Sequence, residues 1–112
     1  MTAHTIIEAD VEVRCPTVAE IRAEVARFYG VTELDLLSAR RTRDIARPRQ
    51  VAMFLCRHLT KHSLPSIGRF LGGRDHSTVI HALESVEDMM KTDSNFKATV
   101  DDLGKKLKMR VS

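Results

Sequence analysis

Apolar residues recur at every third or fourth position in four separate stretches of this sequence, and capping residues or glycines separate the stretches. The spacing is clearest in residues 18–28, 51–59, 79–90 and 96–107, and it places the apolar side chains of each stretch on one face of an α-helix. No stretch after residue 15 alternates apolar and polar residues convincingly, as a half-buried strand would. The pattern therefore predicts an all-α bundle of about six helical pieces.

Local signals place the ends of these helices. Thr17 and Glu20 have the spacing of a capping box, and Gly30 supplies a left-handed stop. Pro48 suits the first turn of a helix, because an amide there has no intrahelical partner, so the basic stretch before it is expected to be a loop. The doublet Gly72–Gly73 is expected to break the chain between two helices. We expect the six pieces at residues 17–30, 32–37, 48–62, 63–71, 75–90 and 94–107.

The size and composition describe one globular domain: 112 residues, of which 43% are hydrophobic and 29% charged. No stretch approaches the roughly 18 apolar residues of a membrane span, and the first fifteen residues lack the apolar run of a signal peptide. Cys15 and Cys56 provide no disulfide framework. We expect residues 1–15 to be a flexible leader, residues 16–112 to be the domain, and the protein to be cytoplasmic, acting at the nucleoid.

Positive charge is concentrated in the middle of the chain. Between residues 38 and 74 there are nine lysines and arginines and a single acid, Asp44, whereas acids outnumber bases in the rest of the chain. Such a distribution predicts an anionic partner for the middle segment. The alternative is a solvated charged face.

The stretch S-L-P-S-I-G-R-F-L-G-G-R-D-H-S-T-V-I-H-A, residues 63–82, has the outline of a helix-turn-helix, whose second helix enters the DNA major groove with its N-terminus. Asp75 can accept a hydrogen bond from a cytosine amino group, His76 and Ser77 can meet donors or acceptors, and Thr78 can contact phosphate. Asp75 can also cap the helix. The alternative at this point is an ordinary helical hairpin with a surface histidine.

Arginines elsewhere in the basic segment favour the first interpretation. Arg40, Arg41 and Arg43 lie in the expected loop, where they could act as an arm in the minor groove. The spacing of Arg49, Arg57 and Lys61 predicts one shared helix face that clamps phosphates; the alternative is a solubilising face.

Two runs of the sequence, R-R-T-R-D-I-A-R-P-R-Q-V-A-M-F-L and H-S-L-P-S-I-G-R-F-L-G-G-R-D-H-S-T-V-I-H-A, resemble the C-terminal DNA-binding domain (domain IV) of the bacterial replication initiator family DnaA. The resemblance runs from about Val18 to Leu107 and implies a Trp-repressor-like helix-turn-helix bundle. It implies that Arg41, flanked by Arg40 and Arg43, enters the minor groove of a nine-base-pair DnaA box. It further implies major-groove contacts by Leu64, Pro65, Asp75, His76 and Ser77, and backbone contacts by Arg49, Gln50, Arg57, Lys61, His62, Ser63, Arg74 and Thr78.

The sequence departs from this family in two respects. Ser77 stands where the family usually has threonine, which removes a methyl group that could pack on thymine. No G-x-x-x-x-G-K-[ST] motif occurs, so we expect neither nucleotide nor another cofactor, and a stand-alone protein that recognises double-stranded DNA at DnaA-box-like sites to control replication initiation or transcription. The alternative is a protein-interaction module of the same ancestry that binds the full-length initiator or another partner.

Enzymatic chemistry is not expected. His58 and His62 are four residues apart but have no glutamate between them and no third ligand, so no metal site is predicted. Asp75, His76 and Ser77 contain the letters of a catalytic triad, but adjacent residues at a helix start cannot form its hydrogen-bond relay. Cys56 lies in an apolar stripe and is expected in the core.

Overall fold

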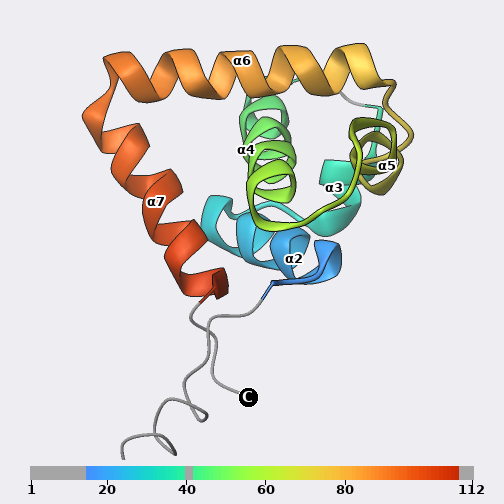
Figure 1. Ribbon diagram of the computed structural model, residues 1–112, viewed down its shortest axis with the longest axis horizontal. Coiled ribbons are helices and arrows are strands. Elements are labelled where there is room, and N and C mark those ends of the chain that lie inside the picture. The colour runs from blue at the N-terminus through green and yellow to red at the C-terminus, as the bar shows by residue number, and fades with distance from the viewer. Residues whose placement is uncertain (1–14, 40–41, 109–112) are drawn as a thin grey trace, which may run out of the picture.

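The computed structural model describes residues 15–39 and 42–108, and within these ranges it contains helices and no strand (Figure 1). Helix α4 is central and packs against each of the other helices, with α6 across one end of it and α2 at the other. The predicted all-α architecture is confirmed. The six helices of the described residues are α2 (Val18–Tyr29), α3 (Glu33–Leu37), α4 (Arg43–Leu59), α5 (Leu64–Phe70), α6 (His76–Thr92) and α7 (Ser94–Lys108).

One apolar core joins the helices. Val51, Met53 and Cys56 of α4 are fully or almost fully buried, and Ile21 of α2 and Val79 of α6 close over them. The stripe of α7 predicted from spacing is buried as well, at Phe96, Val100, Leu103 and Leu107. Burial of these side chains is the main favourable term that holds the bundle together.

Several of the predicted helix ends agree with the structure, although those of α4 do not. Thr17 and Glu20 form a reciprocal capping box, with hydrogen bonds of 3.1 and 2.9 Å, and Gly30 ends α2 at φ 71°. A second capping box at Thr32 and Asp35 starts α3. The hydroxyl of Ser63 caps α5 by accepting from the amide of Ser66. The sequence therefore encodes most of its helix boundaries locally.

The start of α4 was predicted wrongly. The helix begins at Arg43 rather than near Pro48, and residues 43–47 are helical instead of forming a loop. The carbonyl of Thr42 accepts hydrogen bonds from Ile45 and Ala46 at 3.1 and 2.8 Å, and Ile45 is 2% exposed. Burial of Ile45 and of Pro48 itself outweighs the cost of a proline inside a helix. Arg43 is therefore a helical residue.

The break predicted at Gly72–Gly73 is confirmed, with φ values of 95° and 79°. After this turn the amide of Arg74 donates to the carbonyl of Gly68 at 2.9 Å. A Cβ atom on Gly68 would stand 2.0 Å from the carbonyl oxygen of Arg74, so α5 and the segment leading into α6 pack backbone against backbone. This close contact sets how α6 leaves the turn.

Two expectations concern residues outside the described ranges: the leader, of which residues 1–14 are not described, and the two arginines Arg40 and Arg41. No helix of the described residues is long and apolar enough to cross a membrane.

Candidate nucleic-acid interface

The first turn of α6 presents an exposed polar surface. Asp75 is the N-cap, and its Oδ1 accepts a hydrogen bond of 2.9 Å from the backbone amide of Thr78. The hydrogen bonds from Thr78, helped by the nearby His76 and His81, hold the pKa of Asp75 below its usual value. His76, Ser77 and Thr78 are exposed. The structure thus confirms Asp75 as a cap and leaves the first turn of α6 open to solvent.

Two further residues of α6, which were not predicted from the sequence, extend this exposed surface by one turn. Ile80 is 37% exposed, and the side chain of His81 is 79% exposed. Ile80 lies outside the buried stripe formed by Val79, Ala82 and Val86. The sequence contained a signal for Ile80, because it is an apolar residue on the side of the helix that is otherwise polar. Such a residue can contact a thymine methyl group.

A groove of about 530 Å³ lies between the first half of α4 and the start of α6. Gln50 lines it from α4, and Asp75, Thr78 and His81 line it from α6. Figure 1 shows α6 lying across the N-terminal end of α4. The structure therefore places the predicted contact residue Gln50 in the same groove as Asp75 and Thr78, which were also predicted to contact DNA.

Arg49 does not share an exposed face with Arg57 and Lys61, so that prediction is wrong. Arg49 is buried, with 8% of the residue exposed. Nε donates to the carbonyl of Leu36 at 2.9 Å, and Nη2 donates to the carbonyls of Asp35 and Ser38 at 3.1 and 2.9 Å. Burial, with a smaller effect of the charge of Arg74, lowers the pKa of Arg49. The guanidinium satisfies carbonyls at the end of α3, and the structure does not support a phosphate contact by it.

The side chain of Arg74 also binds the protein backbone instead of extending into solvent. It is half-buried, and its Nη2 donates to the same carbonyl of Ser38. Its Nε is buried and has no hydrogen-bond partner among the described residues. The predicted backbone contact by Arg74 would require this guanidinium to leave the Ser38 carbonyl.

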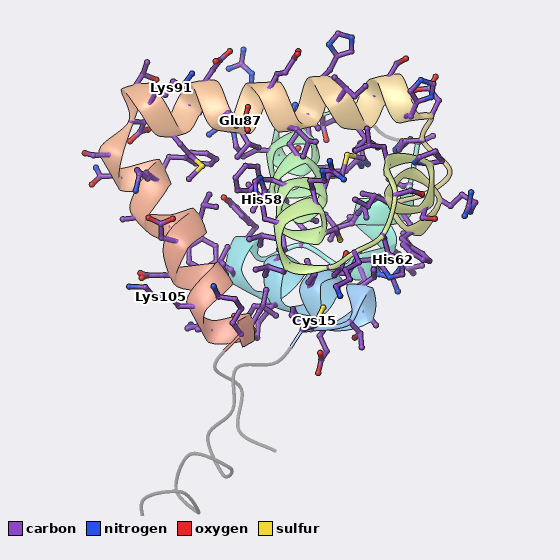
Figure 2. The ribbon with its side chains drawn as sticks, in the orientation of Figure 1. Cys15, His58, His62, Glu87, Lys91 and Lys105 are labelled. Carbon is purple, nitrogen blue, oxygen red and sulfur yellow. The ribbon has the colours of Figure 1, made fainter. Side chains whose placement is uncertain are left out.

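The remaining predicted contact residues lie around the turn from α4 to α5. All of them are exposed except Leu64, which is half-buried. The ring of His62 packs edge-on against Phe70 with centroids 4.9 Å apart, and Figure 2 shows His62 on the side of the molecule that carries α5. Lys61 follows the end of α4 rather than lying on it. The residues of this turn are Arg57, Lys61, His62, Ser63, Leu64 and Pro65.

The described residues contain no group of three histidine, cysteine or acidic side chains that could hold a metal ion. His58 stacks on Phe54 and borders a cavity shared with α7, whereas His62 borders one on the side of Cys15 (Figure 2). Cys56 is buried, as expected, and burial raises the pKa of its thiol to about 12. A thiol with this pKa stays protonated at neutral pH.

The short helix α5, the glycine turn and α6 with its exposed first turn define a helix-turn-helix domain, a class in which the second helix enters the DNA major groove. Residues 18–86 match the family described as bacterial DnaA protein helix-turn-helix. The chain therefore belongs to the bacterial DnaA helix-turn-helix family.

Individual proteins show the same relationship. The chain is 48% identical over 95 residues to the chromosomal replication initiator protein DnaA of Wolbachia pipientis wMel, covering 85% of this chain and 21% of that protein. It is 45% identical over 91 residues to the DnaA protein of Streptococcus equi subsp. zooepidemicus (strain MGCS10565), covering 81% and 20%. A crystal structure of a DNA replication initiation factor matches with a TM-score of 0.76 at 37% identity, covering 85% of this chain and 29% of that one. The chain thus spans about a fifth of the length of these DnaA relatives.

Proposed function

We propose that this chain binds double-stranded DNA sequence-specifically at DnaA-box-like sites, and that it does so by itself. In this proposal the first turn of α6 reads the major groove, while the segment of Arg40 and Arg41 enters the neighbouring minor groove. Its biological role is the control of replication initiation or of transcription, at the nucleoid.

One observation carries the proposal: the described residues on either side of Arg40 and Arg41 lie near the start of α6. Ser38, which precedes the segment, is hydrogen-bonded to Arg74 directly before α6. Thr42, which follows it, is the N-cap of α4, and the first half of α4 shares a groove with the start of α6. A minor-groove arm and a major-groove helix must start from neighbouring points to reach adjacent grooves of one duplex. The positions of Ser38 and Thr42 near the start of α6 support the proposal in this respect.

The side chains exposed at the first turn of α6 have the chemistry needed to contact DNA bases. Asp75 is ionised and retains acceptor capacity for a cytosine amino group. His76 and Ser77 are exposed and can donate or accept hydrogen bonds, and Ile80 offers apolar surface to a thymine methyl. Contact by Ile80 can replace the contact of the threonine methyl group that is absent at Ser77. The exposed cations Arg57 and Lys61 supply phosphate contacts.

The test is a mobility-shift titration of the full chain on a duplex with a nine-base-pair DnaA box and on a scrambled duplex of the same composition. Wild type should prefer the box, with affinity falling steeply as salt rises. Arg41→Ala and His76→Ala should each weaken box binding roughly 5- to 150-fold and scrambled binding less. Lys61→Ala, the matched control, should weaken both duplexes equally. Equal wild-type affinity for the two duplexes would overturn the proposal.

A further inference from the structure

The C-terminal end of α5 is held by a side chain of α2, a helix outside the helix-turn-helix. Nη1 of Arg22 donates a hydrogen bond of 3.0 Å to the backbone carbonyl of Phe70, the last residue of α5. The two residues are 48 positions apart in the sequence. The last carbonyls of a helix have no intrahelical partner and carry partial negative charge. Arg22 therefore acts as a C-terminal cap of α5 that another helix supplies.

The guanidinium of Arg22 is held on a second side as well. Its Nε lies 3.5 Å from Oε1 of Glu33 in the first turn of α3, and 23% of the Arg22 side chain is exposed. Burial raises the pKa of the Cys56 thiol, and the charge of Arg22 opposes part of this rise, as a guanidinium close to the core would. Arg22 thus connects α2, α3 and α5.

The hydrogen bond from Arg22 spans a place that side chains do not fill. The main helix contacts of α5 are with α4 and α6. A surface cavity of about 530 Å³ is lined by Val18 of α2, by Lys61 and His62 after α4, and by Phe70 of α5. Groups that border a cavity have room to move, because they lack packing partners on one side. The hydrogen bond from Arg22 to the Phe70 carbonyl therefore limits the movement of the end of α5.

We propose that Arg22 is a positioning residue for DNA recognition: by holding the Phe70 carbonyl, it fixes the end of α5 from which the glycine turn leads into α6. This inference rests on the proposed function and deepens it. The turn follows Phe70 after one residue, and it is bound back to α5 by the hydrogen bond from the amide of Arg74 to the carbonyl of Gly68. The orientation of the end of α5 is thereby passed to the start of α6.

A residue in this role contributes to recognition without contacting DNA. Contacts to base edges require the first turn of α6 in a defined orientation, whereas contacts from exposed cations to phosphates carry no sequence information. A hydrogen bond formed during folding orders α5 and the turn before DNA is bound. Its loss should weaken binding to the box more than binding to a scrambled duplex. The salt dependence should not change, because the same phosphates are neutralised.

The experiment compares Arg22→Met with the matched control Arg27→Met on box and scrambled duplexes across a salt series. Arg27 lies on the same helix, pairs with Glu24 and has 66% of its side chain exposed, so its variant removes the same charge but keeps the hydrogen bond to Phe70. Arg22→Met should weaken box binding about tenfold and scrambled binding less than about twofold, with the wild-type slope of log Kobs against log salt. Arg27→Met should stay within about twofold of wild type on both duplexes. Arg22→Lys retains a cationic donor and should recover most of the box affinity.

Amide hydrogen exchange without DNA tests the contact separately. The amides of Leu71, Gly73 and Arg74 donate to carbonyls of α5, and they should exchange faster in Arg22→Met than in wild type. Exchange in α7 should not change, and urea unfolding should stay cooperative. If Arg22→Met does not unfold cooperatively, Arg22→Gln, which retains a shorter amide donor, takes its place in both measurements, and the same box-specific loss is expected.

The proposal is overturned if Arg22→Met weakens binding to both duplexes equally, if it binds like Arg27→Met, or if Arg22→Lys binds the box no better than Arg22→Met. Unchanged exchange of the turn amides would show that the hydrogen bond does not fix the end of α5. If wild type itself binds the two duplexes equally, the proposed function fails, whereas the exchange result still decides whether Arg22 holds the turn.

Discussion

Both the surroundings of the Ser38 carbonyl and the first turn of α6 contain polar side chains, but these side chains have opposite environments. Near Ser38, Arg49 is buried and donates to backbone carbonyls of its own chain. At the start of α6, Asp75 uses one carboxylate oxygen as a cap, and His76 and Ser77 remain exposed. One region holds the fold together, and the other is free to meet a partner.

This difference shows that the polar residues of a binding motif can have two roles: some position the fold, and others contact the partner. Arg49, Arg74 and His76 all lie in the stretches that carry the family resemblance. Only the packing around each side chain separates those that position from those that contact. The two roles also predict different losses: a positioning residue affects stability or specificity, whereas an exposed reader affects binding while leaving the fold intact.

The largest effect is expected where the turn touches α3. Gly72→Ala should lower the free energy of unfolding by roughly 2–5 kcal/mol, because Gly72 has φ 95° and a Cβ there would overlap the carbonyl of Leu37. Gly73→Ala is the matched control, since its φ is 79° but nothing lies within 4 Å of an added Cβ. It should cost about 1–2 kcal/mol. Urea unfolding followed by circular dichroism measures both, and equal losses would show that α3 does not constrain the turn.

A smaller loss is expected from the buried guanidinium. Arg49→Met should lower the free energy of unfolding by about 2–3 kcal/mol, because carbonyls at the end of α3 lose a charged donor. Arg57→Met, an exposed change on the same helix, should stay within about 0.5 kcal/mol of wild type. The same unfolding measurement decides. A wild-type stability for Arg49→Met would show that Arg49 does not stabilise the end of α3, and it would reopen a role in phosphate binding.

The smallest effect concerns the cap of α6 and appears only in acid. Because the folded protein lowers the pKa of Asp75, its contribution to stability is present above the unfolded value of about 3.9 and is lost as pH falls through the folded pKa. Asp75→Asn retains a good capping residue but no titrating group. Its melting temperature should match wild type near pH 7 and fall less steeply below about pH 4. Parallel curves for the two proteins from pH 7 to 2 would contradict this assignment.

Local signals in the sequence predicted a large part of the fold correctly. The capping box at Thr17, the left-handed stop at Gly30 and the break at Gly72–Gly73 each depend on the backbone preferences of a few neighbouring residues. The buried stripe of α7 follows from helical spacing alone. These features could be predicted because the residues that determine them are adjacent in sequence.

The start of α4 and the roles of Arg49 and Arg74 could not be predicted in this way. A proline at position 48 and a run of arginines favour a loop locally, but in the folded chain Ile45 is buried and residues 43–47 are helical. Arg49 and Arg74 are 11 and 36 residues from the carbonyl that they share. Side-chain chemistry, caps and periodicity were thus determined by the sequence itself. Tertiary packing decided which cations bind carbonyls of the chain and which are exposed to solvent. The reason is that a guanidinium donates to any oxygen that the fold brings within reach.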